Sequence, residues 1–522
     1  MLILSIGIAP TTTSELFIVA LIPRSDETKN LLSYYLNFVV VALVGIVINP
    51  IMLMIMGPSS FGTWKALQRY LDFASVADGR ATQALKWLVA NRTALSPDEK
   101  RRDLGAAVRV WLFWLPALVG IAVLITIAVP LLVADIPDDL LRSVYWASAI
   151  LASNLALAGL LSIPDSVLVG VNKGYQSMVV TTAIVVISNA GMVLVLMHGG
   201  GLAGLAIVVL IASVVNAVVT WLVARSSVPW WGFARPERAD VARVTTFSAW
   251  TLAWSLVEKV LLSSELILVG LTVGVVGVAQ LTFTTFVGQF VLSIALITAS
   301  GYMPRVGALY GTGARRRATG MTRDIRHTVL GISVVGFASV IMFNGWFVSL
   351  WAGEDQYLGW LVNVGLAVAM LLTAMIRLDG QVLDAVLKMP AKVLVVGLST
   401  VIGIVGGVAF FYWTGSLVVS LAFLIASRTL ANFLLPVLIG KFFAGAGYPA
   451  RAMVLAAALL ALSISLSWVA QAPGWLQAVA IGSWFVLTLA AVVGGLVPRR
   501  LITAFLMTLR SRRGRGSDST PD

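Results

Sequence analysis

Cysteine is absent from this 522-residue chain, and charged residues make up only 11% of it. The lack of cysteine excludes disulfides and thiolate metal sites. Histidine occurs only at His198 and His327, far apart in the sequence, so a histidine metal cluster or a serine–histidine hydrolase is not expected. Soluble domains carry roughly 25% charged residues. The shortage of charge points away from a soluble enzyme, and we assign no catalytic residue, metal ligand or resident cofactor.

Apolar residues account for 59% of the chain and occur in long runs, such as 118–134 and 456–470. A run of about 18 residues can cross a ~30 Å hydrocarbon core as a helix. Strands of a membrane barrel would alternate apolar and polar residues, and these runs do not. We therefore predict an all-α polytopic membrane protein with about 14 transmembrane helices. The expected spans are 32–56, 61–79, 104–133, 141–161, 175–197, 203–224, 247–271, 276–300, 328–350, 358–378, 391–412, 416–439, 451–470 and 475–497.

The formal net charge of +13 is concentrated in alternate connections. Each connection after an even-numbered span carries Lys or Arg, and the C-terminal tail is rich in Arg. Connections after the odd-numbered spans carry neither residue, and two of them, 133–139 and 353–356, are acidic. Basic loops stay cytoplasmic. The pattern predicts a multi-pass protein of the bacterial inner membrane with both termini cytoplasmic and a basic face suited to anionic lipids, with no need for nucleic acid as a partner.

A short internal repeat suggests two related halves. DSVLVGVNK (165–173) resembles DGQVLDAVLK (379–388), with one constant spacing from Val167/Val382 to Lys173/Lys388. Two facing bundles with a site between them are a transporter design. We predict two pseudo-symmetric six-helix bundles followed by two C-terminal helices. The expected segments are an ambiguous leader (1–30), an N-terminal half (31–225), an interfacial linker (226–246), a C-terminal half (247–440), two added helices (441–498) and a basic tail (499–522).

Three stretches carry a resemblance to a known family. IMGPSSFGTWKALQRYLDFASVADGRATQALKWLVAN (55–91), the Gly-Gly-Gly-Leu-containing stretch 163–207 and FSAWTLAWSLVEKVLLSSELILVG (247–270) resemble Wzx-type O-antigen and polysaccharide flippases. The resemblance implies a fold shared with multidrug exporters and peptidoglycan-precursor flippases, and alternating access by two halves. It also implies a polyprenyl-diphosphate-linked oligosaccharide as cargo. Glu265 departs from the family, in which Asp is common at this position.

Flipping such a cargo breaks no covalent bond but requires a polar, partly cationic cavity in the bilayer. An ionisable residue inside the membrane is costly and marks a functional candidate. Lys65, Arg69 and Asp72 share one face of span two, and the last two lie roughly 12–17 Å deep. We expect Lys65 and Arg69 to attract the diphosphate and Asp72 to act as a gate or in ion coupling. A self-neutralised set that only joins helices is the alternative.

Span seven carries a second group of charges. Ser255, Glu258 and Glu265 share a face, and Lys259 lies beside them. Glu258 could take up a proton or balance Arg69 across the cavity, and a structural ion pair between the halves is the alternative. We assign Lys259 to the cargo and both glutamates to a gate or to coupling by H+ or Na+.

Each of the remaining candidate site residues has a structural role as its alternative. Arg109 faces the cavity or snorkels to the interface. Arg377, Asp379 and Asp384 form a gate between the halves or a solvated helix end. Polar residues of span eight bind sugar hydroxyls or join helices: Gln280, Thr282, Thr284, Thr285 and Gln289. Trp64 and Trp254 lie near the charged faces and are assigned to stacking on sugar rings.

A multidrug or small-molecule exporter of the same superfamily is the alternative function. Cationic cavity faces favour an anionic cargo over cationic drugs. A membrane glycosyltransferase, polymerase or ligase is disfavoured because no large outer loop is present, and a channel-like or inactive scaffold is the fourth hypothesis. Expected partners are the lipid-linked oligosaccharide, anionic membrane lipids and, more weakly, glycan-assembly enzymes.

Overall fold

The computed structural model describes residues 26–74, 82, 85–86, 88–89, 96–132, 136–245, 249–311, 313–386, 389–471 and 475–498. Every regular element among these residues is a helix, as predicted. Large apolar side chains face outward along the helices, with Met54 79% and Leu350 74% exposed. An apolar exterior of this kind is suited to lipid rather than to water.

The first described helix, α2 (Asp26–Ala74), doubles back on itself. Gly57 has φ +75° and ψ +165°, outside the helical region, and Pro58 follows at a position where a helix can start. On one straight helix, Asn49 and Lys65 would lie about 24 Å apart. Instead the Lys65 ammonium donates a hydrogen bond to Asn49 Oδ1 at 3.0 Å. Spans one and two are therefore the two legs of one helical hairpin.

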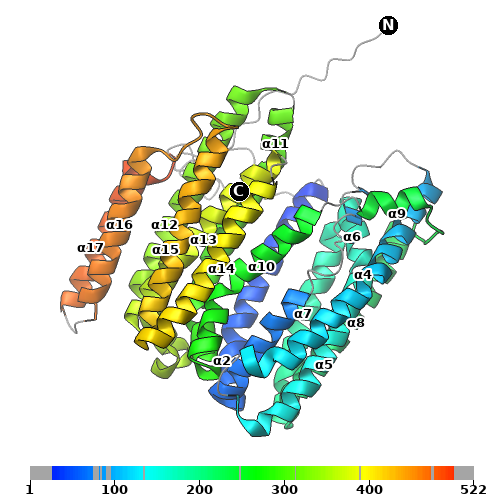
Figure 1. Cartoon of the computed structure of the whole chain (residues 1–522), viewed down its shortest axis with the longest axis horizontal. Coiled ribbons are helices and arrows are strands. Elements are labelled where there is room, and N and C mark those ends of the chain that lie inside the picture. Colours follow the sequence, from blue (N-terminus) through cyan, green and yellow to red (C-terminus); the bar gives the residue numbers. More distant parts are fainter. Residues whose placement is uncertain are drawn as a thin grey trace, which may run out of the picture.

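The helices form two groups that lie side by side in Figure 1. The N-half comprises the following elements: α2, α4 (Pro97–Leu132), α5 (Asp138–Leu161), α6 (Ile163–Gly170), α7 (Gly174–Met197) and α8 (Gly201–Ser227). Helix α9 (Arg238–Thr245) lies in the predicted linker and packs on α4. The C-half comprises α10 (Ala249–Thr272), α11 (Val275–Gly311), α12 (Arg315–Ala352), α13 (Trp360–Ala385), α14 (Met389–Thr414) and α15 (Leu417–Gly440).

Two further helices flank the C-half on the side away from the N-half (Figure 1). They are α16 (Ala450–Val469) and α17 (Trp475–Ala491), and α17 ends in a short π-helical turn, Val492–Leu496. Helix α16 packs on α12. His327 of α12 is 2.9 Å from the carbonyl oxygen of Gly495 and ties the π-helical turn to the C-half.

Twelve helices in the described part of the chain are long and apolar enough to cross a membrane. One of the twelve, Leu32–Asp72, is 41 residues long and contains both legs of the hairpin. Helix α10 is not among the twelve because Glu258, Lys259 and Glu265 interrupt its apolar sequence. Separating the two legs of α2 and adding α10 gives the expected set of crossings. The chain is a multi-pass membrane protein.

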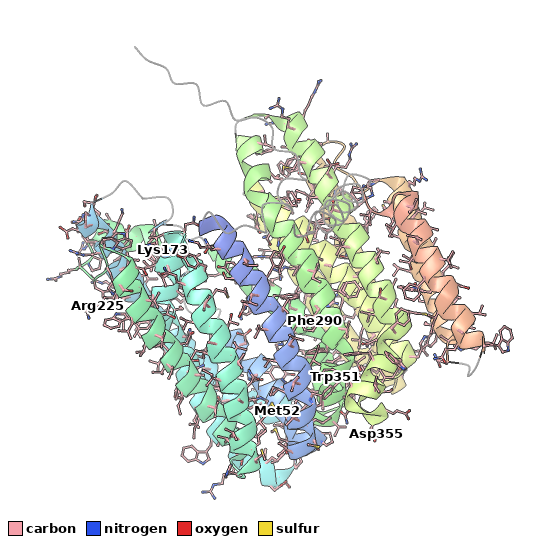
Figure 2. All side chains as sticks on the ribbon, turned by 180° about the vertical axis from the view of Figure 1, so that it is seen from behind. Met52, Lys173, Arg225, Phe290, Trp351 and Asp355 are labelled. Carbon is pink, nitrogen blue, oxygen red and sulfur yellow. The ribbon has the colours of Figure 1, made fainter. Side chains whose placement is uncertain are left out.

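Charge distinguishes the two ends of the bundles. Lys173 and Arg225 lie at one end, here called the basic end, and Asp355 lies at the opposite, acidic end (Figure 2). Helix α2 starts at the basic end, where the Asn30 amide donates to Asn172. Gly57 therefore lies near the acidic end, and the second leg runs back towards the basic end.

The halves meet mainly where α2 packs on α11. Phe61 stacks on Phe283 with ring centroids 5.3 Å apart. A Cβ added at Gly62 would lie 1.8 Å from the carbonyl oxygen of Val275. Only glycine fits at this position, so the backbones of the two halves touch near the acidic end.

Some boundaries differ from the prediction. Helix α12 begins at Arg315 rather than near residue 328, because its charged first turns continue the helix beyond the apolar stretch. Helix α2 begins within the predicted leader, and helix α9 covers only the end of the predicted interfacial linker. Residues 1–25, the end of the predicted second span and the basic tail lie outside the described residues.

Candidate functional site

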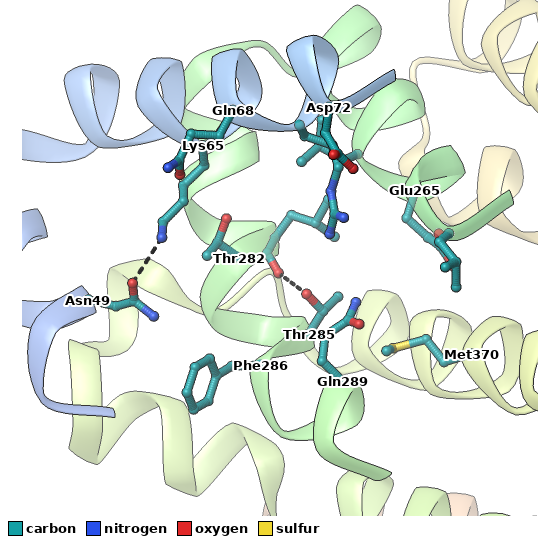
Figure 3. A pocket seen from close by; sticks show the side chains of 14 residues that line it. Asn49, Lys65, Gln68, Asp72, Glu265, Thr282, Thr285, Phe286, Gln289 and Met370 are labelled. Atoms are coloured by element: carbon teal, nitrogen blue, oxygen red, sulfur yellow. Dashed lines mark hydrogen bonds between the residues drawn. The ribbon is translucent and has the colours of Figure 1, made fainter. Parts of the chain in front are cut away.

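A cavity of about 500 Å³ lies between the two halves. The N-half contributes both legs of α2, and the C-half contributes α10, α11 and α13 (Figure 3). Its lining residues are Asn49, Lys65, Gln68, Arg69, Asp72, Leu262, Glu265, Leu266, Leu281, Thr282, Thr285, Phe286, Gln289 and Met370. The volume is within the range of about 300–1,000 Å³ that small-molecule sites occupy.

Helical spacing brings polar side chains to this cavity. On α2, Lys65, Gln68, Arg69 and Asp72 follow one another at intervals of three, one and three residues, which places them on one face. On α11, Thr282, Thr285 and Gln289 form a similar row. The two threonine hydroxyls donate to carbonyls of their own helix, at 2.8 Å each, and keep lone pairs as acceptors. The cavity is therefore polar on both sides.

The two cations of the cavity are Lys65 and Arg69. The Lys65 ammonium bonds the neutral Asn49 amide and lies 5.2 Å from the centre of the Phe61 ring. Among the described residues, no carboxylate forms an ion pair with either side chain. Like charges four residues apart on a helix repel, and the low dielectric of a membrane interior strengthens this repulsion. An anion between them would relieve it.

Each of the two lining carboxylates has a cationic partner. Asp72 Oδ2 is 2.6 Å from Lys259 Nζ on α10, and Glu265 Oε1 is 2.6 Å from Arg428 Nη1 on α15. Arg428 is 1% exposed and also donates to Ser264 Oγ and to the carbonyl oxygens of Ala369 and Leu261. With both carboxylates neutralised, the positive charges of Lys65 and Arg69 dominate the cavity.

Other predicted gate residues pair within the C-half. Glu258 of α10 lies 2.7 Å from Arg377 of α13, and Asp384 binds Lys392 of α14. The Lys392 ammonium also lies 3.8 Å from the centre of the Trp254 ring. Within the described residues these pairs join α10, α13 and α14 to one another and do not reach the N-half.

Asp379 has a different setting at the basic end of the C-half. It forms a two-pronged ion pair with Arg326 of α12, with distances of 2.8 and 2.9 Å, and both side chains are 1% exposed. The Tyr448 hydroxyl donates to Asp379 at 3.3 Å. Burial raises the pKa of Tyr448, so the hydroxyl stays protonated as a donor. This cluster holds α12, α13 and the α15–α16 connection together.

Four predicted cargo residues lie away from the cavity. Arg109 is exposed on α4. The Gln280 amide donates to the carbonyl oxygen of Asp355 at 2.8 Å, at the acidic end. Trp64 is 1% exposed within the helix packing, and Trp254 is 8% exposed beneath Lys392. The structure thus places Lys65, Arg69, Asp72, Glu265 and Gln289 around one cavity, and Lys259 at its edge through Asp72.

Several residues in and around the cavity were not predicted from the sequence. Asn49, Gln68 and Met370 line the cavity without any charge to mark them. Arg428 and Lys392 are buried cations within predicted spans, and a charged residue inside an apolar span was a signal available from sequence. No group of three or more potential His, Cys, Asp or Glu metal ligands occurs in the described ranges.

The chain is similar to known proteins in fold. No protein-family model matches the sequence, and a search of curated proteins finds no match. Solved structures do match. The lipid II flippase MurJ in an inward closed conformation superposes with a TM-score of 0.64 at 12% identity, over 89% of this chain and 97% of MurJ.

MATE transporters share the same architecture. A mutant of the Vibrio cholerae MATE transporter VcmN gives a TM-score of 0.57 at 15% identity, over 80% of this chain and 96% of that one. An inward-facing multidrug resistance MATE transporter of the MOP superfamily gives 0.54 at 14% identity, over 83% and 98%. These identities establish likeness of fold. The chain therefore has the fold that is found in the lipid II flippase MurJ and in MATE transporters.

Proposed function

We propose that this protein is a flippase that carries a polyprenyl-diphosphate-linked oligosaccharide across the bacterial inner membrane by alternating access of its two halves. One observation carries the proposal. The cavity between the halves contains Lys65 and Arg69 without a carboxylate partner among the described residues, whereas its own carboxylates, Asp72 and Glu265, are each held by another cation.

The physical argument concerns the charge of the cargo. A diphosphate crossing the hydrocarbon core would lose its hydration at a cost of many kcal/mol. Lysine and arginine replace that hydration with charge-assisted hydrogen bonds. The neutral amides of Gln68 and Gln289 and the hydroxyl oxygens of Thr282 and Thr285 line the same space and suit sugar hydroxyls. The polyprenyl tail would stay in lipid.

A multidrug or small-molecule exporter is the second candidate, because MATE transporters share the fold. Cationic drugs would favour a cavity with unpaired carboxylates. Here Asp72 and Glu265 are both paired, which favours the anionic cargo. The MurJ neighbour is named as a flippase for lipid II, and a lipid-linked cargo is consistent with that likeness.

Arg69→Ala tests the proposal directly. The protein is reconstituted in liposomes with a fluorescent polyprenyl-diphosphate-linked trisaccharide, and movement between leaflets is followed by chemical quenching from outside. Loss of one charge-assisted contact is expected to slow flipping roughly 10- to 100-fold. Arg109→Ala, which removes an exposed arginine outside the cavity, is the matched control and should keep the normal rate.

Two results would contradict the proposal. One is an unchanged flipping rate in well-folded Arg69→Ala protein. The other is that the unmodified protein transports a cationic dye such as ethidium but does not flip the trisaccharide lipid. That result would identify the protein as an exporter.

Energy coupling, orientation and partners belong to the same proposal. We propose coupling to H+ or Na+ through Glu258 or Glu265, a cytoplasmic basic end that contacts anionic lipids, and handover of cargo from glycan-assembly enzymes. Glu258→Gln should remove the dependence of flipping on an imposed ion gradient. The neutral glutamine has no negative charge that binding of H+ or Na+ could neutralise, so its contact with Arg377 would not respond to the ion. Normal gradient dependence in this variant would exclude Glu258 from coupling.

A further inference from the structure

We infer that Lys259 is a third cation for the diphosphate and that Asp72 competes with the cargo for it, so that cargo binding breaks an ion pair linking the two halves. This inference rests on the proposed function, because it takes the ligand to be a diphosphate. The observation behind it is the 2.6 Å contact between Lys259 Nζ and Asp72 Oδ2 at the edge of the cavity.

The position of the pair follows from the two helices that carry it. Asp72 extends the row begun by Lys65 and Arg69 along the face of α2 that lines the cavity. Lys259 lies three and seven residues before Leu262 and Leu266, the residues with which α10 lines the same cavity. The Lys259 ammonium is therefore aimed at the cavity edge and lies at the end of the row of cations on α2.

The pair also differs from the other ion pairs in what it connects. Among the described residues, the remaining ion pairs lie within the N-half and its linker or within the C-half. Of the ion pairs between described residues, Asp72–Lys259 is the one that joins α2 to α10 across the boundary between the halves. Because the second leg of α2 runs from Gly57 towards the basic end, the pair lies on the basic side of Lys65 and Arg69.

Accessibility makes this pair suited to exchange. The Asp72 side chain is 50% exposed and that of Lys259 is 22% exposed. Partly solvated pairs contribute little to stability. A diphosphate already held by Lys65 and Arg69 offers more negative charge than one carboxylate and acts at high local concentration. Lys259 would then transfer from Asp72 to the phosphate oxygens, and the two halves would lose their ionic contact at the basic side of the cavity.

Binding measurements separate this role from a structural one. The probes are farnesyl diphosphate and farnesyl monophosphate, added to the purified full-length chain in nanodiscs. Lys259→Gln should weaken diphosphate binding about tenfold and monophosphate binding much less, which lowers the affinity ratio between the two. Asp72→Asn should strengthen diphosphate binding about twofold to fivefold. A strut between helices would leave the ratio unchanged.

Glu237→Gln is the matched control, since Glu237 forms an equally short pair with Arg102, at 2.6 Å, on a surface away from the cavity. It should change neither affinity. An unchanged affinity ratio in Lys259→Gln, or no gain in Asp72→Asn, would overturn the inference. If Arg69→Ala still weakens diphosphate binding in the same assay, the proposed function survives that result. If Arg69→Ala has no effect, the proposed function fails first.

The absence of cysteine from the chain allows a direct measurement of the movement. Spin labels at Ser226→Cys and Arg316→Cys mark exposed positions of α8 and α12 at the basic end of each half. Farnesyl diphosphate should lengthen the distance between the labels, and Asp72→Asn should show the longer distance without it. A distance that stays constant under both conditions would contradict the loss of contact between the halves.

Discussion

Ion pairs in the two halves differ in depth. In the C-half, Arg326 and Asp379 meet at 2.8 Å and both side chains are 1% exposed. In the N-half, Lys86 and Asp165 meet at 3.4 Å with about a third of each side chain exposed. The repeat seen in the sequence begins at Asp165 and Asp379. Similar positions therefore hold a deeply buried pair in one half and a hydrated pair in the other.

Apolar packing shows the same difference. In the most apolar stretch of α13, 67% of residues are buried, compared with 6% in α7. The C-half is packed around a central helix and tied by ion pairs, whereas the N-half presents most of its helix surface outward.

Asp379→Asn should produce the largest effect. The substitution leaves a fully buried guanidinium without its counter-charge, which costs roughly 3–5 kcal/mol of folding free energy. Thermal unfolding of purified protein, followed by tryptophan fluorescence, should show a large drop in midpoint or no stable protein at all. Asp165→Asn is the matched change in the N-half and should cost less than about 1 kcal/mol. Equal losses of folding stability in both variants would contradict the difference between the two halves.

Gly62→Ala tests the contact between the two halves and should have an intermediate effect on stability and flipping. The added methyl would lie 1.8 Å from the backbone oxygen of Val275, so α2 must move away from α11, at a cost of roughly 1–3 kcal/mol. Unfolding and flipping rates measure the effect. Gly120→Ala, where the new Cβ would meet nothing besides the adjacent backbone of its own helix, serves as the control. A Gly62→Ala protein as stable and active as the control would contradict the close contact.

Much of the fold could be predicted from the sequence because apolar runs, alternating loop charge and helical spacing are local properties. The face shared by Lys65, Arg69 and Asp72 is one example, since three positions on one helix determine it. The hairpin at Gly57 was also expected as a break between spans. The long start of α12 was missed because a helix can continue past the apolar stretch with charged residues, as at Arg315.

Partners across the fold could not be predicted in this way. Glu265 and Arg428 are neighbours only after α10 and α15 pack together, and no local pattern links them. The same applies to Asp379 and Arg326, which lies in a stretch read from sequence as a basic loop. Trp64 lies on the cavity helix, but α2 turns its indole into the packing. Spacing gives the face of a residue, whereas the neighbours decide what that face contacts.

Gln289→Ala should have the smallest effect and sharpen the comparison further. Gln289 is exposed to the cavity on α11, so its neutral amide can bind the sugars, whereas Lys65 and Arg69 of α2 bind the diphosphate. Losing one neutral hydrogen bond should weaken binding of the trisaccharide lipid by about fivefold. Binding of farnesyl diphosphate, which has no sugar, should stay unchanged. Gln280→Ala removes an amide from the same helix that bonds Asp355 instead, and it should alter neither affinity. Equal weakening of both ligands by Gln289→Ala would contradict the assignment of this amide to the sugars.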